Sequence, residues 1–385
     1  MYTLSSPGSV LGVVGGGQLG RMMAEAAAPL GVELIVLDPT PDCPAAPLAR
    51  DQIVGGFDDR EAIAELAERV DALTFEIELA DPDVLESVGE RNDVPVQPSP
   101  TTLRTIQDKL VQKRTLADAG IAVPEFRAVS GVSELRDALS ELGGKAMVKA
   151  RRGGYDGRGN APIEDPAEAE ATLEEIGGEA MVEELVEFER ELSVIGVKGK
   201  EEIATYVVGE NVHEEEILRE TVVPARTDDV VRERAQAVAR DVLDLMNGRG
   251  TYGIELFEKD GEILVNEIAP RPHNSGHWTI EGADSSQFEQ HVRAVLGLPL
   301  GSTTLRDPVV SKNVLGDDRR AREARLSGVE QLLSEPTAHL HWYGKREVRP
   351  LRKMGHFTVF GEDGDSRDEL LESARTYRRY VEFEA

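Results

Sequence analysis

An apolar run that ends in a lysine and continues into a glycine-rich, cationic segment constrains this chain more than any other feature. Ala146-Met147-Val148 leads into Lys149, and the next ten residues contain four glycines and three arginines. Such a segment cannot build a core, but it supplies backbone N–H groups and positive charge to a multiply charged anion. In a Walker loop the lysine follows the glycines and opens a helix.

The residues after this segment, Asn160 to Ile163, are too few and too broken by proline to begin a helix. We therefore predict a strand, a loop over phosphates and a second strand, with Lys149 on the first strand. A basic surface hairpin without a ligand is the alternative.

The chain is strongly acidic, with 72 Asp and Glu against 43 Lys and Arg, a formal net charge of −29 over 385 residues. The acidic residues are spread evenly, which argues against nucleic acids and anionic membranes as partners. Only 10 of the basic residues are lysines. An acidic surface poor in lysine suits a protein that stays hydrated in strong salt, so we expect halophilic adaptation. An acidic binding face is the alternative.

The location of the protein is predicted from three features. Cys43 is the single cysteine, so an intrachain disulfide is excluded and a reducing compartment is expected. No apolar run approaches the roughly 20 residues of a membrane span, and the first residues lack a secretory signal pattern. We expect a cytoplasmic protein that does not enter a membrane.

The first hundred residues follow a strand–turn–helix–strand pattern. A predicted strand at Val10–Val14 leads into the glycines of 15–20, a helix over 21–30 follows, and a second strand at 33–37 ends in Asp38. This is the dinucleotide fingerprint, which taken literally predicts NAD binding. The same strand–turn–helix arrangement is also found where the turn binds a single phosphate, or where its glycines only allow the helix and the strand to pack closely. These two alternatives to NAD binding stay open. Glu76 follows another strand, where substrate contact and a solvated edge are equally consistent.

A pair of glutamates indicates a metal site. Two strands are predicted around a hairpin loop at 260–262, which places Glu255 across from Glu267. Opposed carboxylates repel unless a cation lies between them. With the amide of Asn266 beside them, these oxygen ligands suit Mg²⁺ or Mn²⁺ rather than zinc. Two exposed glutamates in an acidic protein are the alternative.

Two further polar segments have predicted roles. Residues 269–278 place Arg271, His273, Asn274 and His277 directly after the acid pair, at the phosphate end of a bound nucleotide. Zinc between the two histidines is disfavoured, because the intervening glycine opposes the single helix that this spacing requires. Residues 345–353 carry five basic side chains, which we interpret as a second anion site.

Other elements are predicted from periodicity and from glycine or proline breaks. We expect one helix over 101–119, a strand over 204–208 and an acidic loop around His213, where a solvated histidine is the simpler interpretation. A short connector after Glu183 can bind a purine through its backbone, or act as a plain hinge.

Together these motifs resemble the ATP-grasp superfamily and, within it, the N5-carboxyaminoimidazole ribonucleotide synthetase family. The resemblance is carried by Gly15-Gly16-Gly17-Gln18-Leu19-Gly20-Arg21-Met22, Gly153-Gly154-Tyr155-Asp156-Gly157-Arg158-Gly159, Asn266-Glu267-Ile268-Ala269-Pro270-Arg271, His273-Asn274-Ser275-Gly276-His277-Trp278 and Arg349-Pro350-Leu351-Arg352-Lys353-Met354-Gly355-His356. It implies an α/β and α+β fold with three domains: a Rossmann-like (pre-ATP-grasp) domain at 1–97, an ATP-grasp domain at 98–298 and a small barrel-like, hybrid-motif domain at 299–385.

The resemblance also implies an activity: an ATP-dependent ligase that carboxylates 5-aminoimidazole ribonucleotide with bicarbonate, with a homodimer as the expected assembly. The residues implied for ATP are Lys109, Lys149, Gly154, Tyr155, Asp156, Gly157, Arg158, Gly159, Asn160, Glu183, Glu184, Leu185, Val186, Glu191, His213, Asn266 and Glu267. Those implied for Mg²⁺ (or Mn²⁺) are Glu255 and Glu267, and those implied for catalysis are Arg271, His273, Asn274 and Lys353. Those implied for the ribonucleotide are Gln18, Leu19, Glu76, Tyr155, Asp156, Arg158, Lys345 and Arg352, with Lys353 as the alternative to Arg352.

Three rival functions remain. Another ATP-grasp ligase acting on a ribonucleotide amine would use formate or glycine in place of bicarbonate. An NAD-dependent dehydrogenase would leave the glycine-rich loop and the acid pair unexplained. A nucleotide-binding regulator without catalysis would leave Glu255 and Glu267 without a role.

Overall fold

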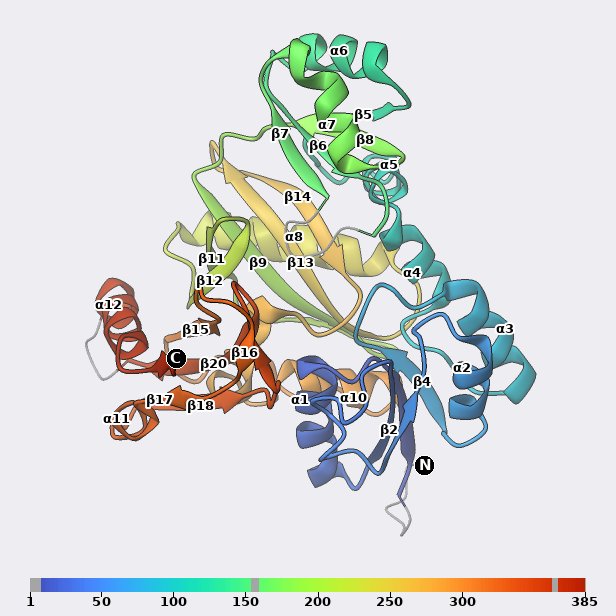
Figure 1. The fold of residues 1–385 in the computed structure, drawn as a ribbon, viewed down its shortest axis with the longest axis vertical. Coiled ribbons are helices and arrows are strands. Elements are labelled where there is room, and N and C mark those ends of the chain that lie inside the picture. Colours follow the sequence, from blue (N-terminus) through green and yellow to red (C-terminus); the bar gives the residue numbers. More distant parts are fainter. Residues whose placement is uncertain (1–7, 154–158, 362–365, 385) are drawn as a thin grey trace.

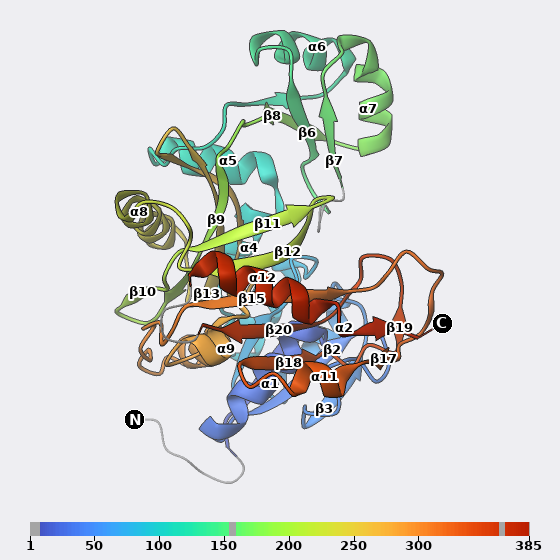
Figure 2. The same cartoon turned by 90° about the vertical axis from the view of Figure 1, so that its left-hand side faces the viewer.

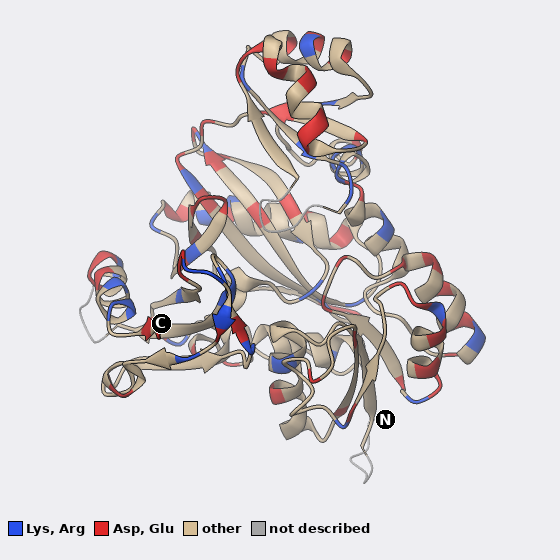
Figure 3. Ribbon diagram, in the orientation of Figure 1, with Lys and Arg blue, Asp and Glu red and all other residues tan. Residues whose placement is uncertain are grey.

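The computed structural model describes residues 8–153, 159–361 and 366–384. Three α/β parts follow one another along the chain, in agreement with the expected fold class (Figure 1). Acidic residues occur in helices of all three parts (Figure 3). No helix among the described residues is both long and apolar enough to cross a bilayer.

The first part is a parallel sheet of order β3-β2-β1-β4 with helices beside it. Its elements are β1 (Val10–Val14), α1 (Gln18–Ala27), β2 (Glu33–Asp38), β3 (Asp51–Val54), α2 (Arg60–Ala67), β4 (Ala72–Phe75) and α3 (Pro82–Asn92). β1, an inner strand, is buried throughout, as expected for a central parallel strand, and β4 at the end of this order is buried as well. Gly15, Asp38 and Glu76 therefore meet at the carboxyl edge of the sheet, where α/β folds bind ligands.

A second, smaller sheet forms what we call the lid subdomain, residues 126–184, at the top of Figure 1. Its elements are β5 (Phe126–Val129), α6 (Val132–Glu141), β6 (Ala146–Ala150), β7 (Asn160–Ile163), α7 (Ala169–Ile176) and β8 (Ala180–Glu184), with the antiparallel strand order β5-β8-β6-β7. Lys149 of β6 pairs with Asn160 of β7, so the predicted strand–loop–strand arrangement is confirmed.

The largest sheet runs through the middle of the molecule in the order β14-β13-β9-β11-β12-β15-β20-β18, with β10 paired to β9. Its strands are β9 (Arg190–Lys198), β10 (Ile203–Thr205), β11 (Gly209–Glu214), β12 (Ile217–Val223), β13 (Gly250–Lys259), β14 (Glu262–Ala269), β15 (Val309–Leu315), β18 (Ala338–Trp342) and β20 (Lys353–Phe360). The apolar side of α8 (Asp229–Leu245) covers one face of β9 and β13 and shares their hydrophobic core. The opposite face of these strands is turned toward the candidate site.

This sheet continues across the predicted domain boundary at residue 298, because β15 of the last part pairs with β12. The remaining elements are α9 (Thr279–Gly282), α10 (Gln287–Val295), β16 (Arg322–Glu323), β17 (Leu326–Ser327), α11 (Val329–Leu333), β19 (Glu347–Val348), α12 (Arg367–Arg378) and β21 (Glu382–Phe383). Figure 2 shows β20 and β18 running beneath α12. The boundaries at 97 and 298 stay predictions.

Several predicted elements are wrong in detail. The single helix expected over 101–119 is two helices, α4 (Pro100–Gln107) and α5 (Lys109–Asp118), because the Asp108 carboxylate accepts the N–H groups of Leu110 and Val111 and caps a new helix. The strand expected over 204–208 ends at Thr205. His213, expected in a loop, lies in β11.

Candidate active site

The predicted acid pair is formed by the last two strands of the large sheet. Glu255 of β13 pairs with Glu267 of β14, as expected, although the loop contains two residues rather than three. Asp260 and Gly261 make that turn with positive φ, and a bulge after Glu255 restores the register. Two carboxylates thus lie opposite each other on the face turned toward the lid subdomain.

The electrostatics of the two carboxylates differ. Burial raises the pKa of Glu255; His213 opposes this shift and Glu267 adds to it. Burial also acts on Glu267, but the ammonium groups of Lys109 and Lys149 outweigh it and lower the Glu267 pKa. Glu267 is thus already paired with cations, whereas Glu255 is held in a partly desolvated position.

Two predicted phosphate-binding lysines reach this pair. Lys109, at the first position of α5, places its Nζ atom 2.8 Å from a Glu267 oxygen. Lys149, on β6 of the lid subdomain, donates to the Asn266 side-chain oxygen at 3.3 Å and forms an ion pair with Glu183. Two lysines far apart in the chain therefore contact neighbouring residues of β14, Glu267 and Asn266.

A third lysine in this cluster was missed by the sequence analysis. Lys113 lies one turn after Lys109, and its side chain is 2% exposed. Its Nζ atom is 3.0 Å from the second Glu183 oxygen and donates to the Val265 carbonyl at 3.1 Å. The i, i+4 spacing of the two lysines was the available signal, because it places both on one face of a helix.

The base of the glycine-rich loop is tied to the same helix. Arg151 donates two hydrogen bonds to the Asp108 carboxylate, at 3.0 and 2.5 Å, and its carbonyl accepts the Lys109 N–H at 2.9 Å. Of the loop residues predicted to cover phosphates, Gly159 and Asn160 follow this base. Gly154, Tyr155, Asp156, Gly157 and Arg158 lie outside the described residues.

The connector predicted to bind a purine follows β8 of the lid subdomain. Glu184 forms an ion pair with Lys259 at 2.6 Å, Leu185 is half-buried and Val186 is buried. Farther along, Glu191 on β9 places its carboxylate 2.5 Å from Nδ1 of His213 on β11. Burial would lower the His213 pKa, but Glu191 and Glu255 raise it overall.

His273 lies beside the acid pair because its backbone is held on both sides. The buried Gln287 amide accepts the His273 N–H at 2.9 Å and donates to the His273 carbonyl at 2.7 Å. The ring places Nδ1 2.9 Å from the Ser275 hydroxyl and Nε2 3.8 Å from Glu255. Held in this way, the imidazole ring lies beside the Glu255 carboxylate.

Asn274 is buried, and neither atom of its side-chain amide has a hydrogen-bond partner among the described residues. Such a group favours a polar ligand or ordered water beside it. The described residues contain no group of three His, Cys, Asp or Glu side chains placed to hold a metal ion, and His277 points its Nδ1 toward Gln287.

The first part of the chain meets the site through Arg271, whose guanidinium lies 2.9 Å from Glu78. Glu76 does not face solvent: Gly17 and Gly20 donate their N–H groups to its two oxygens. Burial raises the Glu76 pKa against these two hydrogen bonds. The amides at the start of α1 thus hold a carboxylate of the protein itself.

This arrangement argues against NAD. Asp38, which would bind a ribose in a dinucleotide fold, instead accepts the Gly16 N–H at 2.9 Å and is buried. A Cβ atom on Gly16 would lie 2.3 Å from Cys43 Sγ, so the space above the turn is filled by the protein. Gln18 and Leu19, predicted to contact the ribonucleotide, form the first turn of α1 at this point.

The C-terminal basic segment is divided between two environments. Lys353 begins β20 and acts on the pKa values of Glu255 and His213, which places it near the acid pair. Lys345 donates to the Lys353 carbonyl at 2.6 Å. Arg352 instead donates to the Glu347 carbonyl at 2.8 Å within its own loop.

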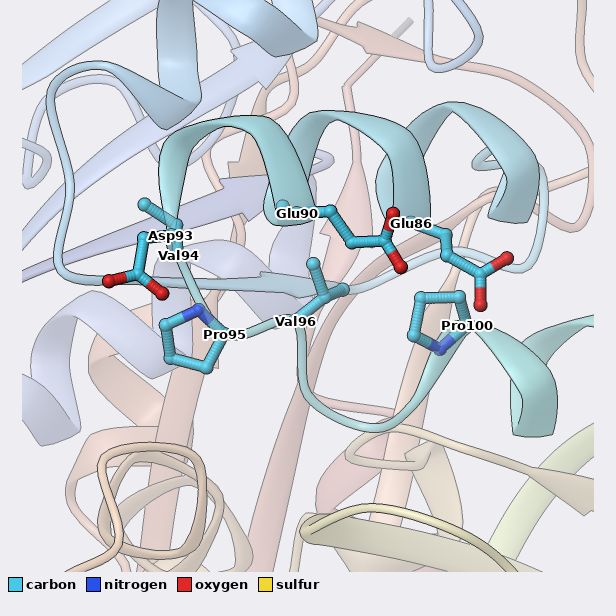
Figure 4. A pocket seen from close by; sticks show the side chains of 8 residues that line it. Glu86, Glu90, Asp93, Val94, Pro95, Val96 and Pro100 are labelled. Carbon is cyan, nitrogen blue, oxygen red and sulfur yellow. The ribbon is translucent and has the colours of Figure 1, made fainter.

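A small hollow on the outer side of α3 is separate from this cluster (Figure 4). Its lining includes Glu86, Glu90, Asp93 and Pro100. None of its residues is among those predicted for substrate or nucleotide, and three carboxylates make it unsuitable for a phosphate. The candidate site is therefore the cluster of charged and polar side chains where Lys149 of the lid subdomain meets β13 and β14 of the large sheet.

Comparison with known families places these elements in three consecutive domains. Residues 9–107 match the ribonucleotide synthetase preATP-grasp domain, residues 114–288 match the ATP-grasp domain, and residues 310–370 match the phosphoribosylaminoimidazole carboxylase C-terminal domain.

Curated relatives cover nearly the whole chain. The N5-carboxyaminoimidazole ribonucleotide synthase of Brucella melitensis biotype 1 is 42% identical over 361 residues, covering 92% of this chain and 97% of the relative. The enzyme of the same name from Bacillus subtilis is 42% identical over 364 residues, covering 93% of each chain.

Solved structures agree over a similar extent. N5-carboxyaminoimidazole ribonucleotide synthetase from Thermotoga maritima superposes with a TM-score of 0.87 at 42% identity, covering 97% of this chain and 99% of that one. The N5-carboxyaminoimidazole synthase of Aspergillus clavatus, in complex with ADP and 5-aminoimidazole ribonucleotide, has a TM-score of 0.87 at 35% identity and 97% coverage of both chains.

The close contact between Gly253 and His273 gives a test of this geometry. A Cβ atom on Gly253 would lie 2.4 Å from His273 Cβ, so Gly253→Ala must displace the imidazole from Glu255. We expect ATP turnover to fall by roughly a hundredfold, since small misplacements of site groups are costly. Gly178→Ala is the matched control, because nothing lies within 4 Å of its new Cβ. Equal turnover of the two variants in steady-state assays would contradict the assigned position of His273.

Proposed function

Because this chain belongs to the N5-carboxyaminoimidazole ribonucleotide synthase family, we propose that it carboxylates 5-aminoimidazole ribonucleotide with bicarbonate and ATP. The products are N5-carboxyaminoimidazole ribonucleotide, ADP and phosphate, and the protein is an ATP-dependent ligase of purine biosynthesis. The observation that carries the proposal is that two lysines from different elements reach neighbouring residues of β14: Lys109 contacts Glu267 and Lys149 contacts Asn266. Glu267 in turn lies opposite Glu255.

The proposed chemistry has two steps. An oxygen of bicarbonate attacks the γ-phosphorus of ATP, and the bond between this phosphorus and the oxygen that bridges it to the β-phosphate breaks. ADP is released, and carboxyphosphate is formed. Carboxyphosphate then transfers its carboxyl group, directly or as released CO₂, to the exocyclic amine of the ribonucleotide, and phosphate and one proton are released. Bicarbonate is a weak nucleophile, so positioning and charge neutralisation contribute more than acid–base catalysis.

The nucleotide would lie between the lid subdomain and the large sheet. Its base would contact the connector at Glu184, Leu185 and Val186, and its phosphates would extend toward Lys109 and Lys149. Glu191, paired with His213, is placed to accept hydrogen bonds from the ribose. This direction follows from the strands, because the connector and the glycine-rich loop leave opposite ends of the lid sheet.

The acid pair suits Mg²⁺ or Mn²⁺ bound together with the phosphates. Two opposed carboxylates and the Asn266 amide offer only oxygen ligands, the set that these ions prefer. When bound, the ion would neutralise charge that develops on the phosphoryl oxygens. Glu267 would exchange its contact with Lys109 for this ion, leaving the lysine to a phosphate.

The remaining polar groups would serve the reacting carbon and the ribonucleotide. Arg271, His273 and Asn274 lie beyond the acid pair and would hold bicarbonate and carboxyphosphate, with Lys353 nearby. Gln18 and Leu19 would face the ribonucleotide from the first domain. Glu76 stays a proposed contact of the same substrate, although glycine N–H groups hold its carboxylate in this structure. Tyr155, Asp156, Arg158, Lys345 and Arg352 stay proposed contacts of the same substrate.

The central experiment measures ADP release by a coupled assay. We expect ADP release to require both bicarbonate and 5-aminoimidazole ribonucleotide, because phosphoryl transfer needs the first and product formation the second. Release driven instead by formate or by glycine with a different ribonucleotide amine would support another ATP-grasp ligase. Release independent of both additions would contradict the proposed reaction.

A second prediction concerns the strand lysine. Lys149→Ala removes a buried cation directed at the phosphates, so ADP release should fall at least about a hundredfold. Lys145→Ala is the matched control, since this lysine directly precedes the same strand but is exposed and paired with Glu164 at 3.4 Å. Wild-type turnover in Lys149→Ala would defeat the assignment of the nucleotide site.

We further propose a homodimer that works in the cytoplasm and tolerates strong salt. The salt proposal is supported by the net charge of −29 and by the distribution of acidic residues over all three parts of the chain (Figure 3). Light scattering in molar potassium chloride should give the mass of two chains. The mass of one chain, or aggregation only at high salt, would oppose the proposal.

A further inference from the structure

We propose that Lys113 is a positioning residue of the nucleotide site, which neutralises Glu183 so that Lys149 can present its charge to the phosphates. The inference rests on the proposed function, because it assigns Lys149 to ATP. It adds a residue that the sequence motifs did not indicate and that need not contact the nucleotide.

The placement of Lys113 is unusual for a lysine in an acidic, salt-adapted chain. Its side chain is 2% exposed, and its carboxylate partner, Glu183, is itself buried. It contacts a Glu183 oxygen at 3.0 Å and the Val265 carbonyl at 3.1 Å. A buried ammonium is costly unless it is paired, so this position has to be specified by its partners.

The partners form a three-charge set. Glu183 is 2% exposed, and its two oxygens contact Lys113 on one side and Lys149 on the other. With both lysines protonated, the set carries one net positive charge at the end that borders Asn266. Without Lys113, Glu183 and Lys149 would form a closed neutral pair, and phosphates would have to compete with Glu183 for the Lys149 ammonium.

The helix α5 delivers two lysines to two acids. Lys109 contacts Glu267 and Lys113, one turn later, contacts Glu183, so two acids of the site each have a lysine from the same face of α5. The two differ in exposure, since the Lys109 side chain borders solvent and the Lys113 side chain does not. Lys109 is therefore placed to move to a phosphate, and Lys113 to remain.

The titratable groups around Lys113 come from every element packed against it: Glu183 of β8, Lys149 of β6 and Lys109 of α5, with the Val265 carbonyl of β14. Burial lowers the Lys113 pKa to about 8; attraction to Glu183 opposes this shift and repulsion from Lys149 adds to it. The ammonium is present below that pH. As the pH rises through it, Glu183 loses one partner and holds Lys149 more strongly.

The experiment compares Lys113→Met, Lys113→Arg and the double variant Lys113→Met with Glu183→Gln in the full chain. Wild-type ADP release with bicarbonate and ribonucleotide is measured first. We expect Lys113→Met to raise the KM for ATP at least about tenfold at neutral pH, because Lys149 stays paired with Glu183. Removing the Glu183 charge in the double variant should recover most of that loss.

The pH profile separates positioning from simple stabilisation. In the wild type the KM for ATP should rise above about pH 8, in step with loss of the Lys113 proton. Lys113→Arg keeps its charge to higher pH, so its KM should stay near the wild-type value at neutral pH and the alkaline rise should be displaced upward. A purely structural ion pair would leave this profile unchanged.

The results of these experiments distinguish the role of Lys113 from the proposed function. An unchanged KM in Lys113→Met, a double variant no better than the single one, or an alkaline rise that Lys113→Arg does not move would each overturn the inference. If Lys113→Met does not fold, the Lys113→Arg profile alone decides. Absence of substrate-dependent ADP release in the wild type would instead defeat the proposed function, and direct titration with ATP would still test Lys113.

Discussion

The buried carboxylate of Glu183 is the interaction on which the rest of the site depends. It accepts Lys149 from the lid subdomain and Lys113 from α5, and both lysines also reach β14, at Asn266 and Val265. One carboxylate thereby fixes the spacing between two sheets that have separate hydrophobic cores. Buried charges hold such positions only when every partner is present, which explains why three lysines and two acids occur together.

The same pairing indicates how the site accepts a nucleotide. Lys109 is paired with Glu267 while the opposed Glu255 lies in a more desolvated position with a raised pKa. When phosphates and a divalent ion bind, the lysine would contact a phosphate and the carboxylates would contact the ion. Each charged side chain would then replace one ionic partner by another and would not be left unpaired. The Glu76 carboxylate in the glycine turn cannot exchange its partners in this way, because they are backbone N–H groups that cannot move away.

The sequence predicted elements and pairings better than it predicted side-chain partners. The lysine-bearing strand and the Glu255–Glu267 pair are confirmed because hydrophobic runs and the turn at Asp260-Gly261 define the strands, although the bulge that corrects the register has no sequence signal. The helix break at Asp108 was missed because an aspartate within a helical pattern does not by itself show that it caps a new helix. Here a tertiary contact, the hydrogen bond from Arg151, helps to hold the Asp108 carboxylate in the capping position. Lys113 was missed because a lysine in a helix is normally solvated, and only tertiary contacts show that this one is buried.

The measurement that tests this account most directly is a crystal structure of the protein with ADP and Mn²⁺, whose anomalous signal locates the ion. The account predicts the ion at Glu255 and Glu267, the phosphates at Lys109 and Lys149, and Lys109 withdrawn from Glu267 while Lys113 remains on Glu183. Nucleotide bound elsewhere, or Lys109 still paired with Glu267 beneath bound phosphates, would contradict it.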